Sequence, residues 1–575
     1  MHIKTVKIQN FKCFEDFELN LNEDINIIVG NNEAGKSTLL EAIYLALTGV
    51  LDGKYLKNEI NPYIFNKKAV KNYYSNKSSN YKELPEIIIE LYFEVGKDED
   101  NEFKEMRGNN NMKSVDECGI QFKILFNEDY QEEYKEFCDS YSCNNNELEV
   151  LPIEFYKIET KSFARDHLTR KKIPIKSVLI DSSINKSKNG SDIYLSYIIE
   201  KSISNEEKIQ ILNAHREMKY TFSNDKNIKN INDRIFQDKY NISEKELKLS
   251  VDLLHNDWQN TLLTYIDDIP FQYIGKGEQC YIKTNLALLD NKAQDASLIL
   301  LEEPESHLSH SKLNSLLDKI KYNISNVSNK NKQIIITTHS SFVANKMLLK
   351  NIIMINYENS IHFTDLKEKT FNFFEKVSGY DTLRLVLSKK TVLVEGASDE
   401  LIFQRAYKDK YGKLPIEDEI DVISVGTSFL RYLELAEKLN NKVIVVTDND
   451  GNVQQLENKY KEYKNNNNIK ICYEKKENTF DDLDIKISDN KNNKNNKNNI
   501  NNKNNINNIN TLEPNLLKYN NIDLFNKIFK TNCKNNISLL NYMLNNKVEC
   551  ALRIFEYHDA IEYPEYIKEA VNECE

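Results

Sequence analysis

A glycine-rich segment near the start of the sequence has the residue types of a phosphate-binding loop. Residues 30–37 read Gly-Asn-Asn-Glu-Ala-Gly-Lys-Ser and fit the pattern G-x-x-x-x-G-K-[ST], between an apolar stretch and a helix-forming stretch. Glycines let backbone amides surround phosphates, and a helix N-terminus adds a positive dipole end. We expect Lys36 to reach the β- and γ-phosphates of ATP, and the Ser37 hydroxyl to bind Mg²⁺. The other residues expected to bind the nucleotide are Asn31, Asn32, Gly35 and Thr38.

Two later segments carry polar residues that could act on the same nucleotide. Glu302 and Glu303 follow the apolar run 298–301, at the end of a strand where ligands of parallel sheets bind. Glu302 would hold the Mg²⁺, and Glu303 would orient or activate the attacking water. His339 follows a second apolar run at 334–336 and could sense the γ-phosphate.

A pair of glycines supplies another candidate phosphate contact. Gly275 and Gly277 precede a helix-like stretch, and such a pair at a helix start can bind phosphate from a second subunit. About 265 residues separate Lys36 from Glu302. A compact GTPase-like domain would not contain so long an insertion.

A second set of acidic residues follows residue 390. Glu395 ends an apolar run, Asp399 lies in the first turn of the next helix-like segment, and Asp448 and Asp450 end another apolar run. Singly, each motif would be an ordinary solvated loop. In a parallel sheet, however, two such strand ends can lie side by side and gather the carboxylates. Hard oxygen ligands at that density suit Mg²⁺ or Mn²⁺, and two such ions can hydrolyse a phosphodiester.

Hydrophobic periodicity predicts the elements that position these residues. Strand patterns occupy 3–8, 15–22, 25–29, 86–95, 120–126, 298–302 and 333–338, a helix is expected at 37–48, and polar helix-like segments dominate 193–265. After residue 388, strands at 391–396, 420–426 and 442–450 alternate with helices at 399–408 and 427–439. This alternation predicts a parallel α/β fold.

Composition excludes several classes of protein. The 575 residues are 40% hydrophobic, which suffices for several cores, and no apolar run approaches the ~20 residues of a membrane span. No signal peptide is visible and the nine cysteines form no CxxC pair, so we expect a reduced cytoplasmic compartment without a zinc site. The net charge of −11 argues against a generally basic surface that coats nucleic acid. Residues 490–510 are only Asn, Lys and Ile, which predicts a disordered insertion.

The nucleotide motifs and the opening 43 residues resemble the ABC-type ATPase heads of the RecF, SMC and Rad50 group. In that group the loop lysine lies near the N-terminus, a long insertion follows, and a glycine-rich signature precedes the acidic strand and a switch histidine. The resemblance implies ATP sites shared between two heads. Residues 275–279 read GKGEQ, in which the first serine of that signature is replaced.

The acidic residues resemble the Toprim fold, which has a strand-end Glu and a later DxD motif. Two further segments, NTLEP at 510–514 and LNNKVECAL at 544–552, resemble elements of the OLD (overcoming lysogenization defect) family of nucleases. By that resemblance Glu513 is a further metal ligand. Lys547 stabilises the charge that develops on the scissile phosphate.

The resemblance implies an α/β chain in which an ABC-type ATPase head with a helical dimerisation insertion precedes a Toprim domain. The expected ranges are 1–375 for the ATPase, with the insertion at about 160–265, and 388–575 for the Toprim domain, with the low-complexity insertion at about 464–510. The expected catalytic residues are Glu303, His339, Glu395, Asp448 and Lys547. The expected metal ligands are Ser37, Glu302, Glu395, Asp399, Asp448, Asp450 and Glu513.

The same resemblance implies an ATP-binding DNA endonuclease that depends on Mg²⁺ or Mn²⁺ and serves in bacterial antiviral defence. Its expected partners are DNA, further copies of the chain in a homodimer or tetramer, and a helicase-like protein, but no membrane. Three other functions stay open. One is a RecF/SMC-like DNA-repair ATPase with a non-cutting Toprim domain, and another is an ATP-controlled scaffold of a defence complex. The third is Toprim chemistry of another kind, that of a primase or a topoisomerase.

Overall fold

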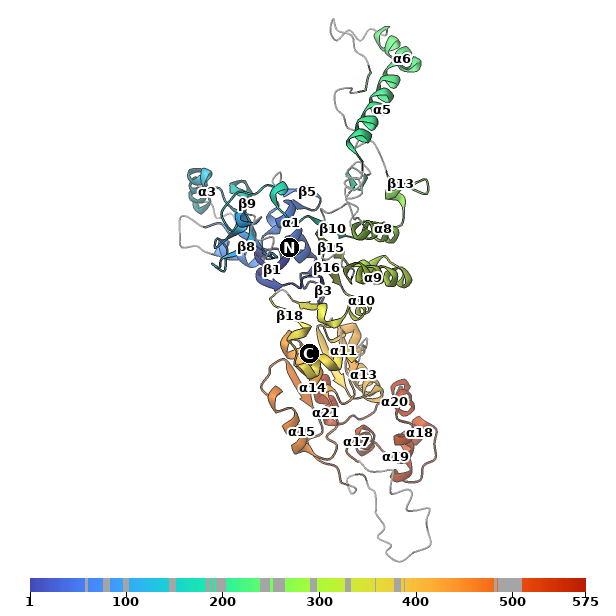
Figure 1. The fold of residues 1–575 in the computed structure, drawn as a ribbon. Coiled ribbons are helices and arrows are strands. Elements are labelled where there is room, and N and C mark those ends of the chain that lie inside the picture. Colours follow the sequence, from blue (N-terminus) through green and yellow to red (C-terminus); the bar gives the residue numbers. More distant parts are fainter. Residues whose placement is uncertain are drawn as a thin grey trace, which may run out of the picture. The chain divides into compact units, whose positions relative to one another are not determined.

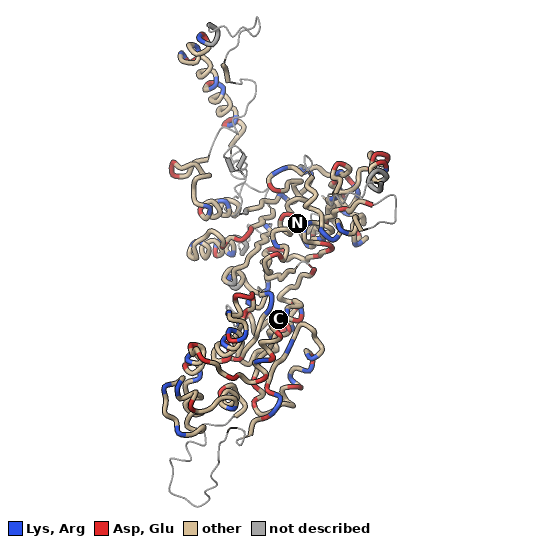
Figure 2. The backbone as a smooth tube through the Cα atoms, turned by 180° about the vertical axis from the view of Figure 1, so that it is seen from behind, with Lys and Arg blue, Asp and Glu red and all other residues tan. Residues whose placement is uncertain are grey.

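The chain folds into two compact units (Figure 1). The first comprises Met1–Asn26 and Ser37–Thr338, and the second comprises Ile27–Lys36 and His339–Glu575. Along both, basic and acidic positions are interspersed (Figure 2). The computed structural model describes residues 1–56, 60–75, 83–96, 103–143, 151–181, 187–188, 191–192, 203–237, 249–251, 264–289, 297–325, 332–356, 358–376, 384–386, 388–479, 483 and 509–575. The Asn-rich run predicted to be disordered lies almost wholly outside these residues.

An antiparallel sheet in the first unit confirms four of the predicted strands. Its order is β2 (Phe14–Asn20), β1 (His2–Phe11), β6 (Ile87–Glu94), β8 (Glu117–Phe126) and β7 (Arg107–Gly108), with β9 (Tyr156–Ser162) also paired to β8. The register sets apolar residues opposite one another, such as Val6 opposite Leu19 and Ile8 opposite Phe17. These four side chains are fully buried, so the alternation of the sequence becomes one buried face.

Parallel strands carry the ATPase motifs. In the first unit β15 (Leu298–Glu302) pairs with β10 (Ser177–Asp181) on one side and β16 (Gln333–Thr338) on the other, with α8 (Lys276–Leu289) and α9 (His310–Ser325) in the same unit. In the second unit β3 (Ile25–Val29) pairs in parallel with β17 (Ile352–Ile355), which also pairs with β18 (Ser360–His362). The predicted strands at 25–29, 298–302 and 333–338 are confirmed.

The expected helical insertion begins later than predicted. Its described helices are α5 (Asn205–Asn224) and α6 (Lys226–Gln237). A capping box starts α5, because the Glu207 amide donates to the Ser204 hydroxyl and the Ser204 amide donates to the Glu207 carboxylate. Residues 160–181 instead contain the end of β9 and all of β10. Strand β10 is rich in apolar residues and pairs with β15. Most of the segment after residue 237 lies outside the described residues.

The second unit contains the predicted parallel α/β domain. Its sheet has the order β20 (Ile420–Ser424), β19 (Lys390–Val394), β21 (Lys442–Val446) and β22 (Ile469–Cys472), and all three pairings are parallel. Helices α13 (Ala397–Tyr411) and α14 (Phe429–Leu439) confirm the alternation. Strand β22 lies inside the expected low-complexity insertion of 464–510, so that insertion begins only after the fourth strand.

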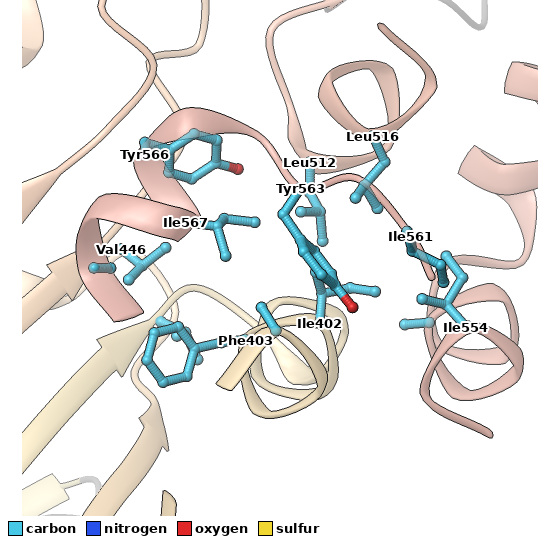
Figure 3. Packing of buried hydrophobic residues seen from close by; sticks show 14 of the residues in the cluster. Ile402, Phe403, Val446, Leu512, Leu516, Ile554, Ile561, Tyr563, Tyr566 and Ile567 are labelled. Atoms are coloured by element: carbon cyan, nitrogen blue, oxygen red, sulfur yellow. The ribbon is translucent and has the colours of Figure 1, made fainter. Parts of the chain in front are cut away.

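Helices from the C-terminal part of the chain complete the core of this domain. They are α15 (Val453–Lys459), α17 (Leu512–Tyr519), α18 (Ile522–Phe529), α19 (Asn536–Asn545), α20 (Lys547–Glu556) and α21 (Glu565–Asn572). One buried cluster joins the sheet to α13 and to all of these helices except α15, with Val446, Phe403, Leu512, Ile554 and Ile567 among its members (Figure 3). Segments more than 150 residues apart in sequence therefore depend on one another for burial.

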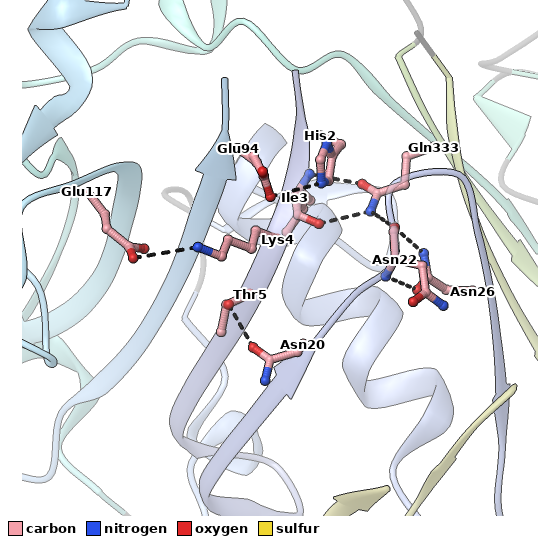
Figure 4. A network of polar contacts seen from close by, with 10 residues as sticks. All are labelled: His2, Ile3, Lys4, Thr5, Asn20, Asn22, Asn26, Glu94, Glu117 and Gln333. Atoms are coloured by element: carbon pink, nitrogen blue, oxygen red, sulfur yellow. Dashed lines mark hydrogen bonds and ion pairs between the residues drawn. The ribbon is translucent and has the colours of Figure 1, made fainter. Parts of the chain in front are cut away.

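Within the first unit, a buried glutamine joins β16 to β1 of the antiparallel sheet (Figure 4). Gln333, the first residue of β16, accepts the Ile3 amide at 3.0 Å and donates to the carbonyl oxygens of Ile3 at 2.9 Å and Asn22 at 2.8 Å. The side chain is only 2% exposed, so water cannot readily replace it. These bonds give buried partners to the backbone of Ile3 in β1 and of Asn22 after β2.

Replacing Gln333 by alanine should destabilise the first unit by about 2–4 kcal/mol, because buried backbone groups lose their partners. Chemical denaturation, followed by far-ultraviolet circular dichroism, measures the change in the free energy of unfolding. Lys4→Ala is the control, because its 3.8 Å ion pair with Glu117 is half-exposed and should contribute less than about 1 kcal/mol. Equal stability losses in the two variants would contradict this assignment.

Candidate functional site

Acidic side chains meet at the carboxyl edge of the β20-β19-β21-β22 sheet. The parallel register of β19 and β21 sets their ends side by side, so Glu395 and Asp448 follow neighbouring strands. Asp399 lies in the first turn of α13, and its Oδ2 accepts the Gly396 amide at 3.1 Å. Predicted strand 442–450 ends at Val446. A turn follows at Asp450 and Gly451, in which Asp450 has a positive φ of 51°.

The carboxylates perturb one another electrostatically. Burial, then the charges of Asp399 and Glu395, raises the pKa of Asp448 well above its usual range. Burial, then the charge of Glu395, raises the pKa of Asp399 to about 7. Burial and the nearby Asp450 likewise raise the pKa of Glu395. The sequence prediction that strand ends bring these acids together is therefore supported by their mutual repulsion.

The two segments that resemble OLD-family elements reach the same edge. Glu513 lies buried in the first turn of α17, and Lys547 is the first residue of α20. The Lys547 ammonium lies 3.3 Å from Glu513 Oε2. The charge of Glu513 contributes to the raised pKa values of Asp399 and Asp448, and that of Lys547 opposes the rise at Glu395. The six residues predicted for the Toprim site therefore lie close enough to affect one another's charges. They are Glu395, Asp399, Asp448, Asp450, Glu513 and Lys547.

The donor set fits a hard divalent cation. Carboxylate oxygens are the ligands that Mg²⁺ and Mn²⁺ prefer, and a cation would offset the repulsion that raises these pKa values. The inner oxygen of Asp448, Oδ1, is buried without a hydrogen-bond partner in the described part of the chain. Among the described residues no three His, Cys, Asp or Glu side chains already surround a metal position.

The glycine-rich loop lies between strand β3 and a helix, as its sequence predicts. Helix α1 (Lys36–Thr48) starts at the loop lysine, whose Nζ donates to the carbonyl oxygens of Gly30 and Asn31, each at 2.9 Å. Nζ also lies 3.5 Å from Nδ1 of His339, so the structure brings two predicted residues together. A Cβ on Gly30 would meet the Ile355 carbonyl oxygen at 2.4 Å, which explains why glycine is needed there.

The other predicted ATPase residues lie in the first unit. Glu302 ends β15, and Glu303 follows with a left-handed backbone (φ 38°), its amide donating to the Thr337 carbonyl at 3.0 Å. The Ser306 hydroxyl donates to Glu303 Oε2 at 3.0 Å. The tight Glu303 turn thus links the ends of β15 and β16. That these two acids act on the same nucleotide as Lys36 and His339 stays a prediction.

One glycine of the pair, Gly277, has a packing role in the structure, whereas a Cβ on Gly275 would meet no neighbour. A Cβ on Gly277, in the first turn of α8, would lie 2.1 Å from the carbonyl oxygen of His307, so only glycine allows this approach. Gly275 precedes the helix, and its carbonyl accepts the Gln279 amide at 3.1 Å. Binding of phosphate from a second subunit stays a prediction for both glycines.

Two residues that the sequence analysis did not single out lie at the acidic edge. Glu474 follows β22, and Tyr566 belongs to α21. A signal for Glu474 exists in the sequence, because it stands two residues beyond its strand just as Asp448 stands two beyond β21. Nothing local marks Tyr566, which reaches the edge only through tertiary packing.

Comparisons with known proteins agree with this two-part architecture. Residues 1–344 match the family model of the AAA ATPase domain, and residues 386–450 match the TOPRIM domain of overcoming lysogenization defect protein-like proteins. The class is therefore an ATPase domain followed by a Toprim domain, which confirms the predicted fold class. The chain belongs to the AAA ATPase domain family, and its residues 386–450 are similar to an OLD-like Toprim domain.

Among individual relatives, endonuclease GajA of Bacillus cereus is 23% identical over 532 residues, 78% of this chain and 77% of GajA. The DNA replication and repair protein RecF of Exiguobacterium is 42% identical, but only over 45 residues, 8% of this chain and 12% of RecF. The crystallised SmcHead bound to ScpA covers 65% of this chain and 100% of its own at 14% identity and a TM-score of 0.32, too low to support an argument. No helix within the described ranges is long and apolar enough to cross a membrane.

Neutralising Asp448 should stabilise the metal-free protein. The Asp448→Asn variant keeps the side-chain shape but removes one charge from the repelling cluster. In EDTA at neutral pH we expect its unfolding midpoint to rise by a few degrees, on the order of 1 kcal/mol. Calorimetry measures the midpoint. Asp421→Asn is the control and should lower it, because Asp421 accepts from the Arg384 guanidinium at 3.1 Å. A lower midpoint for Asp448→Asn would count against charge repulsion at this edge.

Proposed function

We propose that the chain is an ATP-binding, divalent-metal-dependent DNA endonuclease of the OLD type that serves in antiviral defence. The observation that carries the proposal is the convergence of Glu395, Asp399, Asp448 and Glu513 beside Lys547. The similarity to endonuclease GajA over most of both chains supports a DNA phosphodiester as the substrate. The defence role and a helicase-like partner rest on resemblance alone.

The acidic residues would hold Mg²⁺ or Mn²⁺, whose chemistry is to activate water and to stabilise the leaving oxygen of a phosphodiester. The proposed ligands are Glu395, Asp399, Asp448, Asp450 and Glu513. The side chain of Lys547 is 48% exposed and would therefore be accessible to a phosphate of DNA. Its ion pair with Glu513 holds the ammonium at the edge, where it would oppose the negative charge of the transition state.

ATP control of cleavage has a physical route in the second unit. The Asn31 side-chain amide of the loop donates to the carbonyl oxygen of Ser388 at 3.3 Å. Ser388 stands two residues before β19, and Glu395 directly follows that strand. A nucleotide that changes the loop would therefore act on the start of the strand that carries a metal ligand. In the other part of the site, Glu302 with Ser37 would hold the nucleotide's Mg²⁺, and Glu303 and His339 would act on its γ-phosphate.

Exposed apolar side chains on α5 support a homodimer or tetramer. Ile209, Met218, Tyr220 and Phe222 are each at least half exposed on this helix. Ile209 and Tyr220 share one side of the helix and Met218 and Phe222 the opposite side. Exposed large apolar side chains occur in protein–protein contacts. Their position agrees with the dimerisation insertion that the sequence predicts. A cytoplasmic location also stays a prediction.

The central test is cleavage of supercoiled plasmid by the purified chain with Mg²⁺ or Mn²⁺. We expect nicking by the wild type. Lys547→Met should reduce the rate by about 10²–10³-fold, the usual loss when one stabilising donor is removed, and Glu395→Ala and Asp448→Ala should reduce it at least as much. Glu437→Gln, an exposed acid on α14, is the control. A wild type that binds DNA and metal but never cuts would favour the non-cutting repair ATPase.

The response of cleavage to ATP tests the proposed control. Lys36→Ala should remove both ATP binding and any effect of ATP on nicking, because Lys36 is the predicted phosphate ligand. Asn31→Ala should weaken the effect of ATP on nicking more than it weakens ATP affinity, because it removes the bond to Ser388. Titration with a non-hydrolysable analogue measures both quantities. If Lys36→Ala changes only the oligomer size and no variant cuts, the scaffold function is favoured.

A further inference from the structure

Glu474 lies beside Asp448 at the sheet edge, on the same side of the sheet. The register of β21 and β22 pairs Val446 with Cys472, and the Thr447 amide extends the ladder by donating to the Cys472 carbonyl at 3.2 Å. Asp448 and Glu474 each stand two residues beyond that pair. Because side chains alternate along a strand, both continue the side occupied by Val446 and Cys472.

Helix α21 covers that side of the sheet. Val446, Cys472, Tyr566 and Ile567 belong to one buried cluster, and Figure 3 shows Tyr566 and Ile567 on this helix beside Val446. Tyr566 is only 3% exposed. Its hydroxyl must therefore find a partner inside the protein, near the strand ends that carry Asp448 and Glu474.

Three buried polar atoms at this place have no partner within the described residues. They are Asp448 Oδ1, Glu474 Oε2 and the Tyr566 hydroxyl. Burial, then the charges of Asp448, Asp399 and Glu474, raises the pKa of Tyr566, which agrees with their closeness. Buried polar groups of this kind are generally satisfied by an ordered water that makes about three hydrogen bonds.

We propose that Glu474 and Tyr566 are positioning residues for Asp448, which they hold through one shared buried water. The water would donate its two hydrogens to Asp448 Oδ1 and Glu474 Oε2 and accept the hydrogen of the Tyr566 hydroxyl, so all three atoms are satisfied. Asp448 would then keep one orientation toward the divalent-ion site. This inference rests on the proposed metal site, to which it adds two residues that do not themselves bind the ion.

Metal affinity of the full chain tests the proposal, measured by titration calorimetry with Mn²⁺. Partners of this kind typically contribute 10–100-fold to metal affinity, so Tyr566→Phe and Glu474→Leu should each weaken Mn²⁺ binding by about that factor. Glu474→Gln should keep most of the affinity, because its amide oxygen can accept the same hydrogen bond. In plasmid nicking, the Mn²⁺ concentration for half-maximal rate should rise, while the rate at saturating Mn²⁺ approaches that of the wild type.

Tyr563→Phe is the matched control. Tyr563 lies three residues before Tyr566 and is also buried, but its hydroxyl donates to Asp409, away from Asp448. The control should keep wild-type Mn²⁺ affinity even where thermal unfolding shows lower stability. Wild-type affinity in Tyr566→Phe, or an equal loss in Tyr563→Phe, would overturn the positioning role. If the wild type binds Mn²⁺ and Asp448→Asn does not, the metal site stands whatever these variants show; a wild type that binds no Mn²⁺ overturns both proposals.

Discussion

Repulsion between carboxylates at the end of a parallel sheet is the constraint around which the second unit is built. Parallel strands align their carboxyl ends, so a sequence that ends β19 with Glu395 and follows β21 with Asp448 brings like charges together. Burial, and after it the charges of neighbouring acids, raises the pKa of both residues. Burial of the apolar strand residues and of α13, α17, α20 and α21 offsets the repulsion, because each fully buried large side chain contributes about 1.5–3 kcal/mol.

Strand β19 connects this edge to the glycine-rich loop. The loop contacts Ser388 just before the strand, and Glu395 stands just after it, so the two lie at opposite ends of one short element. Five strand residues span roughly 16 Å at about 3.3 Å each. All but the first are buried, and Thr391, Val392 and Leu393 are paired on both sides, which favours a rigid strand. A displacement of the loop at Ser388 would therefore be passed along the strand to Glu395.

The sequence predicts those parts of the fold and site that depend on local pattern. Strand periodicity with terminal acids located β19, β21, Glu395 and Asp448, and glycine spacing located the loop that Lys36 closes. Glu513 and Lys547 came from resemblance, since a lone Glu or Lys carries no local signal. Tyr566 and the close approach of Gly277 to His307 could not be predicted, because both depend on how a distant segment packs. The start of the helical insertion was misplaced because the expected range includes β10, a short strand that pairs with β15.

The costs at the acidic edge explain why its residues belong to one functional unit. A fold that holds several carboxylates close together, with buried oxygen and hydroxyl atoms behind them, is less stable than one with apolar residues in those places. A cation that binds only the folded chain would stabilise it by mass action and relieve the repulsion at the same time. Part of its binding free energy is therefore already present in the metal-free structure as electrostatic repulsion. By the same reasoning, the buried carboxylate oxygen of Glu474 destabilises the fold unless it has a hydrogen-bond partner. A water shared with Tyr566 would supply that partner, which packing alone does not.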